Sequence, residues 1–413
     1  MIYNGSDGGL YDEFNSLGED QEYYYRSNES VKVRRSKNVI LISLDGFSRE
    51  RFNEFKDNLT TIGSLIDEGW TQYNVTNFVY YTQTRNGHAT MLSGYLGEST
   101  GLYGNRYVYH PLPVGFSFLE KAEEEYGSGN VASAFISGKY KNIFPAFKNS
   151  MYQSLDYVHI SEELPNETSG YCTDFLEEYW GCCFVAFFHF RDPDKTGHLA
   201  GEGSVEWVKS LREGDRELGD ILSVFKESRV YNDTLIYITS DHGFKKNGYS
   251  HPHEPYIWLL TNDKEAKVNL DNSLIGVQDI TPTICYSLDL PYDYSEPDSG
   301  HPLQVRFPDE KLEYREKFLL DKERPIIDLW GTRDTIPCLK ARFSVSNDTN
   351  KLLLISDSRD VAGSVVGETE VPHGVETVTM ELDRTIMRKY EEIYLLAYDA
   401  AENPSNLARI DIE

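Results

Sequence analysis

The chain has 413 residues, of which 67 are acidic and 40 are basic, and its formal net charge at pH 7 is -27. This length is more than one ordinary core needs, so we expect one large domain and one small one. Hydrophobic residues make up 39% of the chain and aromatic residues 13%, which excludes global disorder. The strong negative charge repels phosphate backbones and therefore predicts that no nucleic acid polymer is a partner.

The start of the chain and its longest apolar run bear on export and membranes. Residues 1–36 open with acidic and polar side chains where an export signal would place a basic end and an apolar stretch, so they predict an N-terminal extension of a cytoplasmic protein. Seven Asn-x-Ser/Thr sequons favour the alternative, an exported or surface-associated protein. The longest apolar run, 182–188, is far shorter than the roughly 20 residues of a membrane helix, so no membrane span is expected.

Continuous apolar runs predict strands that are covered on both faces, as in a parallel sheet. Between them, residues 205–225 repeat apolar side chains at helical spacing. Strands that alternate with helices predict an α/β fold over residues 37–310, with a mostly parallel central sheet and helices on both faces. The predicted strands are 39–44, 131–136, 183–188, 235–239 and 256–260.

The last quarter of the chain has a different pattern. Residues 306–324 are highly charged and predict a linker or a bridging helix. Short strand-like runs without strong helices follow, which predicts a small C-terminal β-sandwich over residues 325–413. The segment 397–406 resembles the last strands of bacterial immunoglobulin-like or fibronectin type III modules. The predicted strands of this part are 325–330, 339–345, 352–355, 375–382 and 393–398.

Side chains that bind metals gather at the predicted strand ends, where α/β sheets assemble active sites. Asp45 directly follows the first predicted strand, Asp194 follows the third, and Asp241 follows the fourth. Histidines are clustered in the same part of the chain. Five of the ten histidines lie within 65 residues: His189, His198, His242, His251 and His253.

The three aspartates are informative as a group. Each one alone is compatible with an ordinary turn or cap role. Three carboxylates at adjacent strand ends, however, repel one another unless cations lie between them. Two divalent ions reverse this repulsion, and mixed histidine and aspartate ligands favour zinc, with manganese as an alternative. The five cysteines are scattered without a CxxC pair, which argues against a cysteine-based zinc site and against a disulfide framework.

These motifs, in this order between residues 39 and 303, resemble the alkaline phosphatase superfamily, and most closely its type I phosphodiesterase/nucleotide pyrophosphatase branch. The resemblance implies two metal ions and a small phosphoester as the substrate. It assigns one ion to Asp194, His198 and His251, and the other to Asp45, Thr84, Asp241 and His242. His253 and, more distantly, His301 remain alternatives to His251.

Thr84 is the predicted nucleophile. A free threonine hydroxyl is a poor nucleophile, but coordination to a dication lowers the pKa of the hydroxyl. The amide groups of the helix that is predicted to follow also favour an anion there. Attack by Thr84 yields a phospho-threonine intermediate. The alternatives are an ordinary helix cap at Thr84, and Thr82 as the nucleophile.

The residues after the predicted nucleophile distinguish related reactions. Sulfatases of the same superfamily convert a Cys or Ser to an aldehyde, which threonine cannot supply, so phosphoryl transfer is favoured over sulfuryl transfer. Nucleotide pyrophosphatases usually carry Asn at the place of Gly87, where its side chain donates to the phosphoryl group. Because Gly87 lacks this donor, Arg85 and Asn86 are the predicted substrate-binding residues, and the choice between monoester and diester stays open. Lys139 and Lys195 are candidates for contact with phosphate, but both are interpreted as surface lysines.

The main hypothesis is a two-metal phosphoester hydrolase whose substrate is a nucleotide, lipid headgroup, sugar phosphate or phosphonate. A phosphotransferase or mutase on the same scaffold differs only in the phosphoryl acceptor. A sulfatase-like relative and a non-catalytic surface- or carbohydrate-binding protein are further alternatives. The complete set of metal-binding side chains argues against the last of these.

Overall fold

The computed structural model describes most of residues 38–320 and six strands of the C-terminal part. The predicted N-terminal extension, 1–36, and the predicted strand 325–330 lie outside the described residues, and the predicted domain boundaries stay predictions. The gaps within 38–320 are 80–81, 103–104, 106–110, 128, 252–253 and 297.

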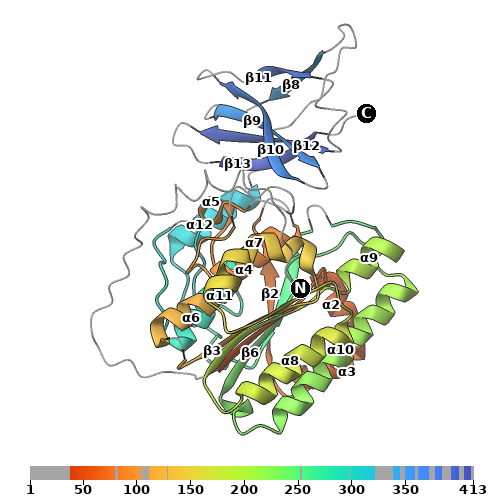
Figure 1. Cartoon of the computed structure of the whole chain (residues 1–413), viewed down its shortest axis with the longest axis vertical. Helices are drawn as coiled ribbons and strands as arrows, with labels where there is room; N and C mark the ends of the chain where they lie inside the picture. The colour runs from red at the N-terminus through yellow and green to blue at the C-terminus, as the bar shows by residue number, and fades with distance from the viewer. Residues whose placement is uncertain are drawn as a thin grey trace. The chain divides into compact units, whose positions relative to one another are not determined.

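In the described part of the chain, seven strands form one sheet in the order β2-β7-β6-β1-β5-β3-β4 (Figure 1). β1 pairs in parallel with β5 and β6, and β3 pairs in parallel with β5 and β4. β7 is antiparallel to both β6 and β2. The predicted mostly parallel sheet is therefore confirmed. The strands are β1 (Asn38–Leu44), β2 (Thr71–Thr76), β3 (Ala132–Ser137), β4 (Tyr157–Ile160), β5 (Phe184–Phe190), β6 (Thr234–Thr239) and β7 (Tyr256–Thr261).

The two edge strands, β2 and β4, are the ones that no apolar run predicted. β4 is exposed or half-buried at every position, and β2 mixes buried with exposed residues. An edge strand has a neighbour on one side only and more contact with water, so its sequence lacks the continuous apolar run of a central strand. By contrast, β1 and β5 are buried at every position.

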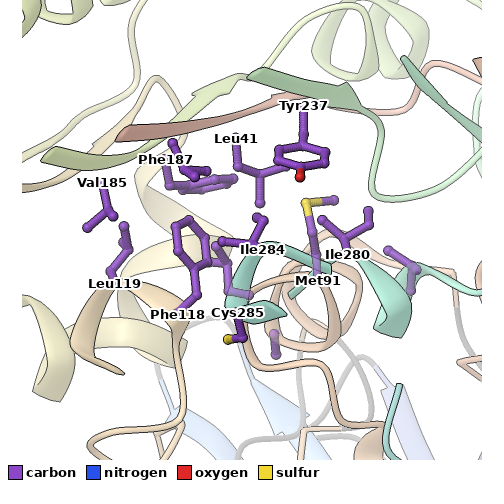
Figure 2. Packing of buried hydrophobic residues seen from close by; sticks show 14 of the residues in the cluster. Leu41, Met91, Phe118, Leu119, Val185, Phe187, Tyr237, Ile280, Ile284 and Cys285 are labelled. Atoms are coloured by element: carbon purple, nitrogen blue, oxygen red, sulfur yellow. The ribbon is translucent and has the colours of Figure 1, made fainter. Parts of the chain in front are cut away.

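Helices cover both faces of the sheet, as predicted. Because successive residues of a strand point to opposite faces, Val39 and Leu41 of β1 join one core cluster, and Ile40 and Ile42 join the other. Figure 2 shows part of the first cluster, where Leu41 lies among side chains of α4, α6 and α11. The helices of this layer are α4 (Thr84–Ser93), α6 (Phe118–Tyr126), α7 (Tyr140–Gln153) and α11 (Ile280–Leu288), and those of the other are α2 (Arg49–Phe55), α3 (Thr60–Asp67), α8 (Pro165–Tyr179) and α10 (Val205–Lys226).

The predicted helix 205–225 is confirmed as α10. Ser204 caps its start by accepting a hydrogen bond from the backbone N–H of Trp207 at 3.1 Å. The apolar face of α10, which includes Trp207, Leu218 and Phe225, packs in the second core cluster. Among the described helices, none combines the length and the apolar character needed to cross a membrane.

The charged segment predicted as a linker or bridging helix contains α12 (Asp309–Leu320). The side chain of Arg315 is 1% exposed and binds Asp279 through two contacts, Nη1 to Oδ2 at 2.9 Å and Nη2 to Oδ1 at 2.6 Å. The guanidinium group also lies over the rings of Phe78 and Phe307. This buried pair attaches α12 to the α/β part of the chain.

The described strands of the C-terminal part form two antiparallel sheets, with the orders β10-β9-β12-β13 and β11-β8. Four predicted strands correspond to β8, β9, β11 and β12, whereas β10 and β13 had no counterpart in the prediction. Packing of the sheets as an immunoglobulin-like sandwich stays a prediction. The strands are β8 (Cys338–Ser344), β9 (Thr349–Ser358), β10 (Val361–Glu370), β11 (Thr377–Asp383), β12 (Glu392–Asp399) and β13 (Pro404–Ile410).

Replacing Arg315 with Met should lower the free energy of unfolding by about 3–5 kcal/mol, because Asp279 then keeps a buried charge without its partner. Urea unfolding of the full chain measures the loss. Lys226→Met is the control, since it breaks an exposed pair with Glu68 and should cost less than about 1 kcal/mol. Equal losses in the two variants would contradict the structural role of the buried pair.

Candidate metal centre

Four parallel strands bring their C-terminal ends to one edge of the sheet, where predicted site residues collect together with Lys139, which was not predicted to belong to the site. Asp45 follows β1, Lys139 follows β3, Asp194 follows β5 after a short loop, and Asp241 and His242 follow β6. Because these strands run in the same direction, residues far apart in the sequence meet at this edge. Asp45, Asp241 and His242 have no exposed surface.

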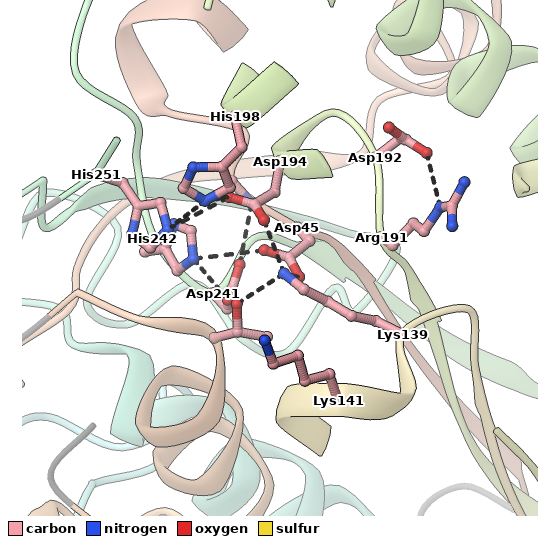
Figure 3. A network of polar contacts seen from close by, with 12 residues as sticks. Asp45, Lys139, Lys141, Arg191, Asp192, Asp194, His198, Asp241, His242 and His251 are labelled. Atoms are coloured by element: carbon pink, nitrogen blue, oxygen red, sulfur yellow. Dashed lines mark hydrogen bonds and ion pairs between the residues drawn. The ribbon is translucent and has the colours of Figure 1, made fainter. Parts of the chain in front are cut away.

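The first candidate cluster consists of Asp194, His198 and His251 (Figure 3). Asp194 begins α9 (Asp194–Ala200), and His198 stands four residues later, so both lie on one face of the helix. His251 comes from the loop before β7. The Nε2 atoms of the two histidines are 3.1 Å apart, and each is 3.4 Å from Asp194 Oδ1.

The second candidate cluster consists of Asp45, Asp241 and His242. His242 Nε2 lies 3.4 Å from Asp45 Oδ1 and 3.2 Å from Asp241 Oδ2. Thr84, the first residue of α4, is fully buried beside this cluster, with its Oγ1 2.9 Å from Lys139 Nζ, which is in turn 2.7 Å from Asp45 Oδ2. The structure thus brings all seven predicted metal ligands to one edge of the sheet.

Gly46 lets the three aspartates converge. Its φ is +74°, and a Cβ at this position would lie 2.8 Å from Asp194 Cβ, so a larger residue does not fit without displacement. The backbone N–H of Gly46 donates to Asp241 Oδ1 at 3.1 Å. The turn after Asp45 therefore packs against Asp194 and donates a hydrogen bond to Asp241.

Each of the three aspartates has one oxygen bound by the protein and one oxygen without a partner. Lys139 donates to Oδ2 of Asp45 and of Asp194. The remaining oxygens, Asp45 Oδ1, Asp194 Oδ1 and Asp241 Oδ2, are buried without a hydrogen-bond partner among the described residues. Burying an unpaired carboxylate oxygen costs free energy, so these atoms fit cations placed between them.

The separations within the two clusters fit a tetrahedral zinc site. Ligand atoms about 2.0–2.2 Å from zinc, at tetrahedral angles, lie about 3.3–3.6 Å apart. The histidine nitrogens and carboxylate oxygens described above are separated by 3.1, 3.2 and 3.4 Å, which is within or slightly below that range. Mixed imidazole and carboxylate donors are also the ligands that zinc prefers over magnesium or calcium. The residues present therefore fit two divalent ions of this type.

The three histidines present Nε2 to their clusters because Nδ1 of each ring is bound to a backbone carbonyl. Since a carbonyl oxygen only accepts, Nδ1 carries the proton and Nε2 keeps its lone pair. Partners of this kind orient metal-binding histidines. The contacts of Nδ1 are Tyr249 O at 2.7 Å in His198, Gly243 O at 2.8 Å in His242, and Thr82 O at 2.6 Å in His251.

The interpretation of Lys139 as a surface lysine is wrong. The residue is 7% exposed, and its Nζ lies within 2.9 Å of Asp45 Oδ2, Asp194 Oδ2 and Thr84 Oγ1. Lysine is usually exposed, but the two carboxylates stabilise its buried charge here. Lys139 comes just after the predicted strand 131–136. Aspartates in the same position after other predicted strands were interpreted as site residues, and this position is the signal that could have identified Lys139.

The charged groups of the centre shift one another's pKa values. Burial raises the pKa of Asp45 and of Asp194, but the charge of Lys139, together with contacts from neighbouring histidines, outweighs burial and leaves both pKa values below their ordinary range. Burial and the charge of Asp45 raise the pKa of Asp241 well above its ordinary value. Burial lowers the pKa of His242 to about 3, which keeps this imidazole in the neutral form that binds metals. One ammonium group thus does not balance three carboxylates, and divalent ions would favour ionised Asp241.

Two further buried histidines support the centre. His189 Nε2 lies 3.0 Å from Asp45 Oδ2, and its Nδ1 lies 2.7 Å from Ser137 Oγ. His88 Nδ1 lies 2.7 Å from the carbonyl oxygen of Thr84, one helical turn earlier. The sequence singled out His189 only as a member of the histidine cluster and did not predict its contact with Asp45. These contacts orient Asp45 and the first turn of α4.

The residues after Thr84 differ in what they contact. Gly87 lies against the backbone of the loop that follows β6. A Cβ at position 87 would lie 2.8 Å from Asp241 O. The Nε of Arg85 donates to Asn142 O at 3.2 Å, and Asn86 is buried. Binding of substrate by Arg85 and Asn86 stays a prediction.

Of the alternative site residues, Thr82 and His301 belong to neither cluster, and His253 lies outside the described residues. His253 is among the residues that the structure does not describe. His301 donates its backbone N–H to Asp279 Oδ1 and belongs to neither cluster. The hydroxyl of Thr82 donates to His251 O at 2.6 Å, so it binds the loop that carries His251.

Comparison with known proteins shows the family of the chain. The family model described as type I phosphodiesterase/nucleotide pyrophosphatase matches residues 39–142 and 158–287, which together make up more than half of the chain. The chain belongs to this family. The matched segments contain all seven predicted metal ligands and Lys139, and the resemblance to the alkaline phosphatase superfamily is confirmed.

Relatives are about 25% identical to this chain over the aligned segments. Venom phosphodiesterase 2 of Crotalus adamanteus is 25% identical over 231 residues, covering 50% of this chain and 27% of the relative. Ectonucleotide pyrophosphatase/phosphodiesterase family member 1 of Homo sapiens is 25% identical over 259 residues, covering 56% of this chain and 26% of the relative. The match thus spans about a quarter of these relatives' length. The solved lipoteichoic acid synthase LtaP from Listeria monocytogenes has a TM-score of 0.46 and 14% identity, covering 65% of this chain and 74% of that chain.

Replacing Asp194 with Asn should lower the zinc content after dialysis from about two ions per chain to about one, because the neutral amide is a weaker ligand in the first cluster. Element analysis of the purified protein measures this change. Asp192→Asn is the control, since Asp192 contacts Arg191 and Thr196 outside both clusters. A similar loss of zinc from both variants, or from neither, would contradict the assignment of Asp194 as a ligand.

Proposed function

We propose that the chain hydrolyses small phosphoesters with two divalent ions, zinc in preference to manganese, and with Thr84 as the nucleophile. The observation that carries this proposal is the position of Thr84 Oγ1 at the start of a buried helix, beside two clusters of metal-binding side chains. Membership of the type I phosphodiesterase/nucleotide pyrophosphatase family supports phosphoester hydrolysis as the reaction. A phosphodiester substrate agrees with the names of the curated relatives.

The metal-binding side chains divide between two ions. Bound there, divalent ions polarise the phosphoryl oxygens and lower the pKa of a coordinated hydroxyl. The buried position of the aspartates strengthens their electrostatic contacts. Asp194, His198 and His251 would hold one ion, and Asp45, Thr84, Asp241 and His242 the other.

Thr84 carries out the first chemical step. It lies at the amino end of α4, where the helix dipole and the first backbone N–H groups favour negative charge. Thr84 Oγ1 attacks phosphorus as its proton passes to water, and the ester bond to the leaving group breaks with its electron pair on the leaving oxygen. The product is phospho-threonine at position 84.

Water ends the reaction by cleaving this phospho-threonine and restoring the hydroxyl of Thr84. A phosphotransferase or mutase would share the first step and differ only in the group that accepts the phosphoryl. Water as the acceptor is therefore part of the proposal, and phosphate release from the phosphorylated chain is its direct consequence.

Thr84→Ala should lower the hydrolysis of p-nitrophenyl phosphate and of bis(p-nitrophenyl) phosphate by about 10³-fold or more, because the nucleophile is gone. Release of nitrophenol by the zinc-loaded protein measures the loss. Zinc content should stay at about two ions per chain, since three protein ligands remain at each ion.

Two variants serve as controls for this experiment. Thr84→Ser keeps a hydroxyl at the same place and should retain measurable turnover. Thr196→Ala removes a half-buried hydroxyl of α9 that donates to Asp192 at 2.6 Å, outside both clusters, and should leave turnover unchanged. Turnover at the wild-type level in Thr84→Ala would contradict the role of Thr84.

A further inference from the structure

Lys139 is a buried cation that contacts the proposed nucleophile and an aspartate from each cluster. An ammonium group has three N–H donors. Three acceptors surround it: Asp45 Oδ2 at 2.7 Å, Asp194 Oδ2 at 2.7 Å and Thr84 Oγ1 at 2.9 Å. Each donor therefore has a defined partner, and the side chain is held in one position (Figure 3).

The backbone around Lys139 keeps the side chain in this position. Its N–H donates to Ser137 Oγ at 3.2 Å, at the end of β3. Ser137 Oγ is also 2.7 Å from His189 Nδ1, and the other nitrogen of His189 lies 3.0 Å from Asp45 Oδ2. One hydrogen-bonded network thus holds both the backbone of Lys139 and the carboxylate of Asp45, which the side chain of Lys139 binds.

The contacts of Lys139 with the carboxylates do not compete with the metal clusters. They use Oδ2 of Asp45 and of Asp194. Oδ1 of each residue lies in its cluster and has no hydrogen-bond partner in the described part of the chain. Lys139 can therefore stay beside Thr84 when both clusters hold ions.

The second half of the reaction develops negative charge beside Lys139. When water attacks the phospho-threonine, the bond from phosphorus to Thr84 Oγ1 breaks, and negative charge develops on Oγ1. A threonine oxygen is a poor leaving group unless this charge is stabilised. A fixed N–H donor 2.9 Å from the oxygen provides such stabilisation.

We propose that Lys139 is a catalytic residue that stabilises the negative charge on Thr84 Oγ1 as the phospho-threonine breaks down. This role rests on the function proposed above. In the step, the oxygen of water forms the new bond to phosphorus, and the electron pair of the broken P–O bond goes to Oγ1. One proton of the water ends on Oγ1, the other stays with the released phosphate, and Lys139 keeps its own protons.

Lys139→Met tests the role in the full chain at saturating zinc, with p-nitrophenyl phosphate as the substrate. Nitrophenolate leaves readily, so the variant should slow the breakdown of phospho-threonine more than its formation. We expect kcat to fall about 10²–10³-fold, the usual effect of removing one such donor. Phospho-threonine at Thr84 should accumulate toward about one per chain, with a matching burst of nitrophenol. Acid quenching and mass spectrometry of the peptide that contains Thr84 measure the accumulation.

A control and a rescue separate the charge of Lys139 from the stability of the fold. Lys195→Met removes an exposed lysine next to Asp194, and both kcat and the level of phospho-threonine should stay as in the wild type. Lys139→Ala leaves space for ethylammonium, so added ethylamine should restore part of kcat and reduce the trapped phospho-threonine. A variant that has lost its fold responds in neither way.

The outcomes distinguish this role from the proposed function. The role of Lys139 is overturned, with hydrolysis left intact, if Lys139→Met keeps near wild-type turnover, or turns over slowly with normal zinc content and no trapped phospho-threonine. Failure of ethylamine to change Lys139→Ala at normal zinc content also counts against the role. A zinc-loaded wild-type chain that hydrolyses neither nitrophenyl ester overturns the proposed function itself, and the role of Lys139 with it.

Discussion

Repulsion among three buried carboxylates is the constraint on which the rest of the site depends. Asp45, Asp194 and Asp241 have almost no exposed surface. One buried ammonium group, that of Lys139, binds two of them, while burial and the charge of Asp45 raise the pKa of Asp241 well above its ordinary value. One oxygen of each carboxylate lacks a hydrogen-bond partner among the described residues. The arrangement therefore requires further positive charge, and two divalent ions would supply it.

The fold makes this convergence of charge possible because its central strands are parallel. β1, β3, β5 and β6 all end at one edge, and short connections are enough to carry their polar residues into the centre. Backbone carbonyls orient the three histidines of the clusters, and the backbone of Gly46 binds one aspartate. The ligand atoms are thus held by strands, helix ends and backbone groups, which limits the rearrangement that metal binding needs.

The success and failure of sequence reasoning follow from burial. Strands β1 and β5 were predictable because both faces are covered, which requires apolar residues at every position. The edge strands β2 and β4 were not predictable, since contact with water interrupts that pattern. Asp45 and Asp241 were expected to belong to the site because carboxylates gathered at adjacent strand ends repel one another unless cations lie between them. Lys139 occupies an equivalent place, but its residue type is exposed in most proteins, so the sequence favoured the wrong interpretation.

The order of motifs along the chain determined the family and predicted the types of metal ligand by itself, because apolar runs and the polar residues that follow them are local features. Only the tertiary structure decided that Lys139 contacts Asp45, Thr84 and Asp194. Asp45 is 94 positions away in the sequence, and Thr84 and Asp194 are each 55 positions away. Such contacts depend on which strands become neighbours and on which side chains lose contact with water. Both result from the packing of all the layers together, and no short segment of the sequence contains that information.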